Sequence, residues 1–244
     1  MQEGYRFPSR KNIVTLLREQ DAWVVRKAFA DAAACEEEAT RMEKAAGCGL
    51  SVPALVRRED DVLFYAYVDG QTALAYLESP GSLTTRSGAR EMWTAFADWI
   101  TAFYNAMGCL IRDCQLRNYI FKTDTCTVTG LDFEGPVISD PAEGLGRLLA
   151  YIKTYRPAGT PEREEILRLL RARWLHAFAG RGLDDERLAA AEEKALQQLR
   201  WLRSEKITGP VAAVRKTEQE EYDAAFGRVL QEILGESQAQ AGQS

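Results

Sequence analysis

The chain has 244 residues, 46% of them hydrophobic, so it can bury a real core as one domain or as two closely joined lobes. Its net charge of −5 argues against nucleic acid as a partner, because neutralising phosphates requires basic surface. No run of about 18 apolar residues and no signal-peptide core is found, and we therefore expect a soluble, cytoplasmic protein without a membrane span. With His176 as the single histidine, a His-rich zinc site is excluded.

Short β-rich runs alternate with turn residues in the first 70 residues, and one run of strong helix formers interrupts them. We expect strands at 13–17, 22–27, 53–57 and 62–68. The helix formers predict a helix at 32–46, with Gly47 just beyond its end as the terminating residue.

Helical periodicity dominates the rest of the chain. An aromatic stripe at spacings of three and four predicts a buried helix at 92–107 that ends at Gly108. We expect a β-hairpin from runs 119–121 and 126–131. Further helices are expected at 145–155, 161–179, 184–204 and 217–234, and a disordered tail at 235–244.

Two acids and an amide flank the predicted hairpin. Asn118 stands at its start, Asp132 at its end, and Asp113 five residues before Asn118. A tight hairpin brings its ends together, so these side chains can face one point. Carboxylate and amide oxygens are hard ligands that suit Mg2+. The alternative is a hairpin whose exposed acids share no function.

The two segments resemble the catalytic core of protein-kinase-like phosphotransferases. Residues 111–118, IRDCQLRN, correspond to the H-R-D-x-x-x-x-N loop, and residues 132–134, DFE, to the D-F-G motif. Ile111 replaces the usual His, and Glu134 replaces the Gly, as in aminoglycoside- and choline-kinase-like proteins. The resemblance implies that Asp113 acts on an acceptor hydroxyl and that Asn118 and Asp132 hold Mg2+.

The same resemblance extends to the N-terminal part. Lys27, at the end of the second predicted strand, corresponds to the lysine that contacts the ATP phosphates. Its neighbour Arg26 would point to the opposite face. A glutamate of the following helix should hold this lysine, and Glu38 fits best, with Glu37 second.

The predicted strand at 62–68 is followed by Asp69 and Gly70, a position that resembles the kinase hinge. The hinge residues that would bind adenine through their backbone are Ala66, Tyr67 and Val68. Asp69 could meet the ribose, although an Asp-Gly turn explains it equally well.

Two kinase features are missing from the sequence. No Gly-rich loop precedes Lys27, and Ser9, Arg10, Lys11 and Asn12 could supply phosphate donors in its place. There is also no long activation segment after Asp132. This second absence favours minimal kinases of the RIO, lipopolysaccharide-kinase and aminoglycoside-phosphotransferase types.

The sequence therefore predicts an α+β, two-lobed protein-kinase-like fold. A small antiparallel-sheet lobe with one helix would span 1–67, and a mainly helical lobe 68–234. The expected reaction is transfer of the γ-phosphoryl of ATP, with Mg2+, to a hydroxyl of a protein or small molecule. Two alternatives remain open: a pseudokinase that binds nucleotide or a partner without catalysis, and a non-kinase binding module.

Overall fold

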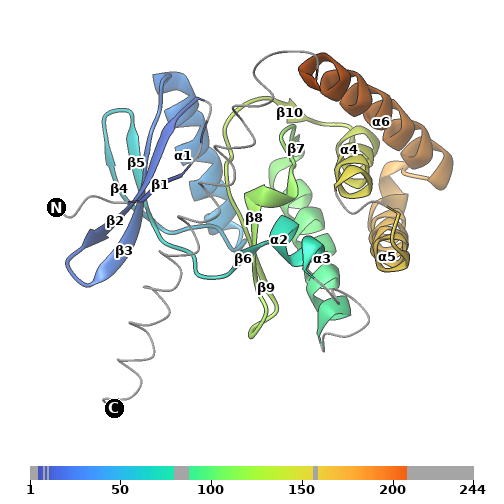
Figure 1. Cartoon of the computed structure of the whole chain (residues 1–244), viewed down its shortest axis with the longest axis horizontal. Coiled ribbons are helices and arrows are strands. Elements are labelled where there is room, and N and C mark those ends of the chain that lie inside the picture. The colour runs from blue at the N-terminus through green and yellow to red at the C-terminus, as the bar shows by residue number, and fades with distance from the viewer. Residues whose placement is uncertain (1–4, 8, 10, 80–87, 156–158, 208–244) are drawn as a thin grey trace.

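The computed structural model describes residues 5–7, 9, 11–79, 88–155 and 159–207, with side chains through 201. An antiparallel sheet in the order β1-β2-β3-β5-β4 opens the chain (Figure 1). Its strands are Tyr5–Phe7, Ile13–Glu19, Ala22–Ala28, Leu55–Glu59 and Val62–Ala66 for β1 to β5. The four predicted strands are present, and β1 was not predicted.

Strand β4 begins two residues later than predicted, at Leu55. Pro53 lacks an N–H for the ladder and lies outside the strand. Strand β5 ends at Ala66 instead of residue 68, so Tyr67 and Val68 belong to the connection that follows.

Helix α1, Ala32–Gly47, packs against β5 and α3. The Asp31 side chain caps it by accepting a hydrogen bond from the N–H of Ala33 at 3.0 Å. Its buried face carries one charged residue, Glu38. The predicted end is wrong by one residue, because Gly47 is still helical and the left-handed backbone conformation falls at Gly49, with φ of 78°.

The middle of the chain forms two further small sheets, of two and three strands, beside a long buried helix. The predicted helix is α3, Ala89–Met107, and Gly108 ends it with φ of 73° and an N–H bond to the Tyr104 carbonyl. The predicted hairpin is β8, Tyr119–Lys122, with β9, Thr127–Gly130. Elements not predicted are β6 (Gln71–Thr72), α2 (Ala73–Glu78), β7 (Leu110–Ile111), the 3-10 turn Leu116–Asn118 and β10 (Val137–Ile138).

Three further helices complete the described chain: α4 (Pro141–Thr154), α5 (Pro161–Phe178, followed by a 3-10 turn at Ala179–Arg181) and α6 (Asp185–Ile207). Helix α4 begins four residues before its predicted start, because Asp140 caps it and Pro141 fits its first turn. His176 is exposed on α5. The predicted helix 217–234 and tail 235–244 lie outside the described residues.

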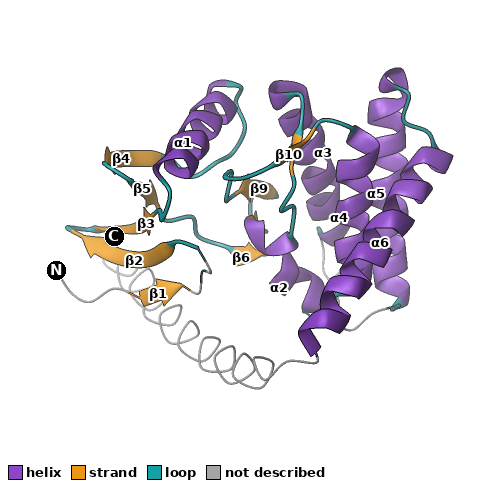
Figure 2. Cartoon of the chain, turned by 90° about the horizontal axis from the view of Figure 1, so that it is seen from above, coloured by secondary structure: helices purple, strands orange, loops and turns teal. Residues whose placement is uncertain are grey.

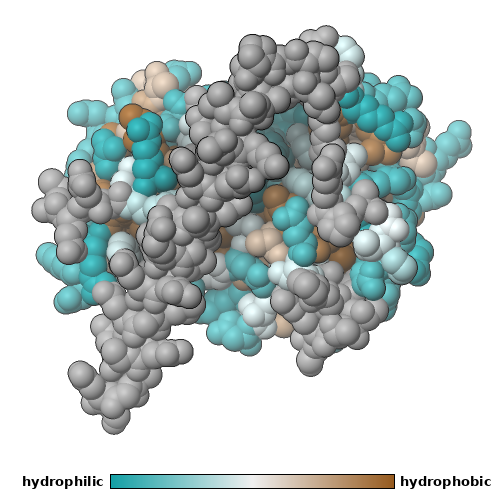
Figure 3. Space-filling model, in the orientation of Figure 1, coloured by the Kyte–Doolittle hydropathy of each residue, from teal (hydrophilic) through white to brown (hydrophobic). Residues whose placement is uncertain are grey.

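Sheet and helices are segregated in space, as an α+β fold requires. The five-stranded sheet and α1 form one end of the molecule, and α3 to α6 form the other (Figures 1 and 2). On the face shown in Figure 3, hydrophilic residues cover most of the described surface, and hydrophobic residues show in small patches. Within the described ranges, no helix has the length and apolar character needed to cross a membrane.

The backbone of β9 approaches α3 so closely that Gly130 has no room for a side chain. A Cβ at this position would lie 2.3 Å from Cζ2 of Trp99. The indole cannot easily retreat, because its Nε1 donates a hydrogen bond to the Ser51 carbonyl at 3.0 Å. Position 130 therefore fixes how near the hairpin lies to α3.

We expect Gly130→Ala to lower the free energy of unfolding by about 1–3 kcal/mol, the usual effect of overpacking. Gly47→Ala is the matched control, because nothing lies within 4 Å of its Cβ position and the site is helical. It should leave stability unchanged or raise it by up to about 1 kcal/mol. Urea unfolding measures both, and equal values for the two variants would contradict the packing argument.

Candidate active site

Lys27 lies at the centre of a buried charge cluster. Its Nζ is 2.6 Å from Oε2 of Glu38 on α1 and 2.6 Å from Oδ1 of Asp132, which follows β9. Lys27 is 7% exposed and Glu38 2%. The alternation of side chains along β3 sends Lys27 toward α1 and Arg26 to the other face. The structure thus brings together three residues predicted from separate parts of the chain.

Tyr65 completes the surroundings of Glu38 and was not singled out from the sequence. Its hydroxyl donates a 2.7 Å hydrogen bond to Oε1 of Glu38, so both carboxylate oxygens have donors. Tyr65 pairs with Val25 in the sheet, two residues before Lys27. It therefore shares a face with Lys27, and the alternation of strand residues could have indicated this.

Burial and charge act in opposite directions on this cluster. Burial tends to lower the pKa of the Lys27 ammonium, but the charges of Glu38 and Asp132 outweigh it, and the pKa is raised. Burial raises the pKa of Glu38, and Lys27 only partly offsets the effect. The ammonium is therefore firmly charged, whereas the ionised Glu38 carboxylate depends on its two donors.

Glu37, the second candidate partner for Lys27, lies elsewhere. One of its carboxylate oxygens accepts from the N–H of Gly135 at 3.0 Å, and the other pairs with Arg41 one helical turn further on. Arg41 in turn donates to the carbonyl oxygens of Phe133 and Gly135, at 2.6 and 2.8 Å. These two α1 residues thus contact the segment after Asp132 instead of Lys27.

Asp113 and Asn118 lie on the loop that leads into β8. The exposed Asp113 carboxylate accepts a hydrogen bond from Nε2 of Gln115 at 2.7 Å. Nδ2 of Asn118 donates to the Asp113 carbonyl at 2.8 Å, which turns its Oδ1 outward. The Asn118 carbonyl accepts from the N–H of Leu131, so the loop is tied to the far end of the hairpin.

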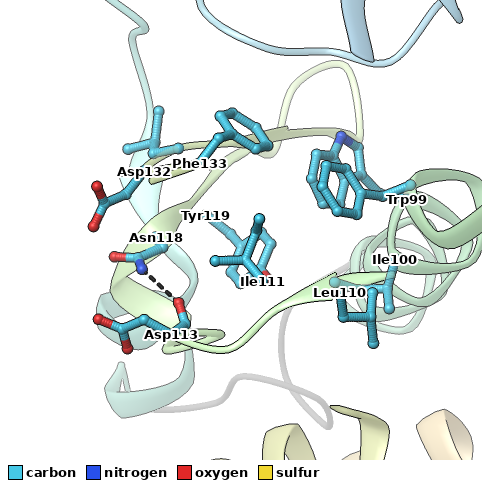
Figure 4. Close-up of a pocket in the computed structure, with 11 residues that line it drawn as sticks. Trp99, Ile100, Leu110, Ile111, Asp113, Asn118, Tyr119, Asp132 and Phe133 are labelled. Carbon is cyan, nitrogen blue, oxygen red and sulfur yellow. Dashed lines mark hydrogen bonds between the residues drawn. The ribbon is translucent and has the colours of Figure 1, made fainter. Parts of the chain in front are cut away.

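Figure 4 shows that the polar ends of Asp113, Asn118 and Asp132 point to the same side, away from the apolar residues of α3 and β7. Among the described residues, no cluster of three or more His, Cys, Asp or Glu could enclose a metal ion. Mg2+ needs no such cluster, since it binds through one or two protein oxygens together with substrate phosphates. Asp132 and Asn118 fit that donor set.

Asp132 has an unusual backbone conformation, with φ of 59°. Outside glycine this left-handed region is populated chiefly by Asn and Asp. The next residue, Phe133, is fully buried and stacks on Phe103 of α3, with ring centroids 5.6 Å apart. Burial of Phe133 on one side and Lys27 on the other holds the Asp132 carboxylate at the surface of the cluster.

The predicted hinge connects the two ends of the molecule. The N–H of Ala66 donates to the Ala54 carbonyl at 2.9 Å, and that of Tyr67 to the Trp23 carbonyl at 3.0 Å. For the N–H of Val68, the described part of the chain supplies no acceptor. Asp69 is exposed and precedes Gly70, where a Cβ would lie 2.7 Å from the Phe121 carbonyl oxygen.

Asn12, expected among the phosphate donors before β2, has other partners. Its Nδ2 donates to Oε1 of Glu134 at 2.9 Å, and its Oδ1 accepts from the N–H of Ala30. Ser9 accepts a bond from the N–H of Asn12, while Arg10 lies outside the described residues. Lys11 is exposed. The side chain of Asn12 is thus engaged within the protein, and a role for it in binding phosphate stays a prediction.

Solved structures that are similar to this chain include two kinases. The Rio2 kinase from Chaetomium thermophilum, in an ADP/Mg2+-phosphoaspartate complex, is 12% identical to this chain, with a TM-score of 0.48. The match covers 80% of this chain and 70% of the Rio2 chain. The kinase domain of PknI from Mycobacterium tuberculosis is 20% identical, with a TM-score of 0.46, and the match covers 79% of this chain and 93% of the PknI chain. A likeness this distant assigns no activity. No protein-family model and no curated protein match the sequence.

The buried pair makes a prediction about stability and pH. Lys27→Met should lower the free energy of unfolding by about 3–5 kcal/mol at pH 8, because it leaves Glu38 buried without its cation. The loss should be smaller at pH 5. Glu38 already has a raised folded-state pKa, and this pKa rises further without Lys27. The unfolded chain therefore releases the Glu38 proton at a lower pH than the folded protein does, and the stability lost by the variant grows as pH increases above 4.5.

Urea unfolding at the two pH values measures this effect. The double variant Lys27→Met/Glu38→Gln removes the buried carboxylate as well, and its stability relative to wild type should vary much less between pH 5 and pH 8. If the loss in Lys27→Met is the same at both pH values, Glu38 is not the group left without a partner.

Proposed function

We propose that this protein is an ATP-dependent phosphotransferase of the protein-kinase-like class. It would transfer the γ-phosphoryl group to a hydroxyl of a protein or small-molecule acceptor. The observation that carries this proposal is the position of Lys27, 2.6 Å from both Glu38 and Asp132. A buried lysine held by one carboxylate and facing a second, half-exposed carboxylate suits the binding of phosphates beside a metal ion.

Each remaining residue has a role that its surroundings support. Asp113 is exposed and held by Gln115, so it can accept the proton of an acceptor hydroxyl while that oxygen attacks the γ-phosphorus. The bond from the γ-phosphorus to the bridging oxygen breaks, and ADP leaves. Asp132 and Asn118 would hold Mg2+, which neutralises charge on the phosphates when bound.

Adenine would be bound at the connection between the sheet and the helices. Ala66 and Tyr67 already use their N–H groups within the protein, which leaves the N–H of Val68 as the backbone donor for the base. The side chain of Asp69 is exposed beside it and could accept from a ribose hydroxyl. Of the predicted hinge residues 66–68 and the neighbouring Asp69, we therefore assign Val68 to the base and Asp69 to the ribose.

One observation favours a pseudokinase as the second candidate. The connection between β1 and β2, residues 8–12, reads PSRKN and contains no glycine, and Asn12 at its end is tied to Glu134. A glycine-rich loop brings backbone N–H groups close to the phosphates, and here that means of binding is missing. Nucleotide binding without transfer would follow if the γ-phosphoryl group were poorly held.

The first test concerns the metal ligand. Asp132→Asn retains a residue that tolerates the left-handed backbone but lacks the carboxylate charge. Saturating Mg–ATP should stabilise the wild type by about 2.7 kcal/mol at 100 times its Kd. In the variant this gain should fall to the value seen without Mg2+, as thermal unfolding with ATP and either Mg2+ or EDTA would show.

Asp124→Asn, on the hairpin turn, is the matched control and should behave as wild type. Undiminished Mg2+-dependent stabilisation in Asp132→Asn would show that Asp132 is not a metal ligand.

The second test separates transfer from binding. Asp113→Asn should leave Mg–ATP affinity nearly unchanged, because the residue faces the acceptor, and should slow ATP turnover by roughly 10²–10⁴-fold. Release of ADP, with water or added hydroxyl compounds as acceptor, is the measurement. Wild type that binds Mg–ATP without any turnover supports the pseudokinase. Turnover equal to wild type in Asp113→Asn would refute the role of this carboxylate.

A further inference from the structure

The four residues 132–135, here named the metal loop, are all bonded to side chains from the first 41 residues. Lys27 pairs with the Asp132 carboxylate, and Asn12 donates to the Glu134 carboxylate at 2.9 Å. The backbone of the other two residues is bonded by α1. The loop is therefore held from the sheet end of the molecule, although it belongs in sequence to the helical part.

Arg41 and Glu37 form a clamp on the backbone of the metal loop. One guanidinium nitrogen of Arg41 donates to the carbonyl oxygens of Phe133 and Gly135, at 2.6 and 2.8 Å. The other nitrogen pairs with Glu37, whose second oxygen accepts from the N–H of Gly135 at 3.0 Å. The two side chains thus bind Gly135 through both its N–H and its carbonyl group.

The clamp can stabilise a backbone conformation of the metal loop that is unfavourable by itself. Asp132 and Gly135 both have positive φ, 59° and 88°, and Asp132 adopts this conformation only at some energetic cost. Charge-assisted hydrogen bonds to backbone groups are about twice as strong as neutral ones. Bonds from Arg41 and Glu37 therefore favour this conformation over its alternatives.

We infer that Arg41 and Glu37 are positioning residues that set the affinity of the site for Mg2+, by holding the metal loop where the Asp132 carboxylate faces Lys27 and Asn118. The inference rests on the proposed function, because it assigns Mg2+ to Asp132. Arg41 itself touches neither metal nor nucleotide in this scheme. It acts on the metal only through the backbone of the loop.

The test compares two arginines that both pair with glutamates of α1. Arg41→Ala removes the clamp, whereas Arg58→Ala removes the partner of Glu36 and leaves the metal loop untouched. At saturating ATP, the Mg2+ concentration for half-maximal thermal stabilisation should rise at least roughly tenfold in Arg41→Ala, because two charge-assisted hydrogen bonds to the loop are lost and the energy of one already corresponds to about tenfold. Arg58→Ala should match wild type.

Two further measurements and one conservative variant distinguish positioning from general damage. ATP affinity in EDTA should be unchanged in Arg41→Ala, since Mg2+ is absent from that measurement. Arg41→Lys keeps a cation that can donate to one carbonyl, and it should recover part of the Mg2+ affinity. This variant also replaces Arg41→Ala in the test if the alanine variant fails to fold. Hydrogen exchange across 131–136 in the nucleotide-free protein should be faster in Arg41→Ala than in Arg58→Ala.

Each outcome has a clear meaning. A raised Mg2+ requirement together with faster loop exchange supports the inference. Faster exchange with an unchanged Mg2+ requirement, or equal weakening of ATP binding in EDTA, overturns it. If wild type shows no Mg2+-dependent ATP stabilisation at all, the proposed function fails, and the wild-type measurement alone reveals this before any variant is compared.

Discussion

The buried ammonium of Lys27 forms the ion pairs on which the arrangement of the molecule depends. It lies between a carboxylate of α1 and a carboxylate that follows β9, so a single cation links the sheet, its helix and the loop that ends the hairpin. Removing any one of these charges leaves the others buried or poorly balanced. Tyr65 adds the donor that the second oxygen of Glu38 requires. The cluster thus satisfies its own polar groups while keeping Asp132 half-exposed.

Much of this cluster could be predicted because its members have local signals. Lys27 ends a β-rich run, Glu38 lies on a helix with a clear apolar face, and Asp113, Asn118 and Asp132 flank a recognisable hairpin. Resemblance to kinase motifs supplied the link between these segments, which periodicity alone could not. The helices capped by Asp140, Thr160 and Asp184 were likewise expected from sequence, although the first of them begins earlier than its apolar pattern suggests.

The sequence did not indicate the other long-range contacts of the loop that follows β9. Arg41 bonds to carbonyl groups more than 90 positions away, and Asn12 to a carboxylate more than 120 positions away. An arginine or asparagine in such a place looks like any solvated residue, because the bonds depend on how the helix and the loop pack. Two-residue strands such as β7 and β10 also could not be predicted from the sequence, because a run this short shows no alternation of polar and apolar residues.

Helix α1 carries Glu37, Glu38 and Arg41 within little more than one turn. A rotation or outward shift of this helix would therefore break the partner of Lys27 and the bonds to the loop backbone at the same moment. Packed elements of this kind have discrete arrangements and resist intermediate ones. Loss of Lys27's partner and loss of the bonds to the loop would thus be coupled, so that a ligand binding one arrangement of α1 more tightly would favour or oppose the whole cluster.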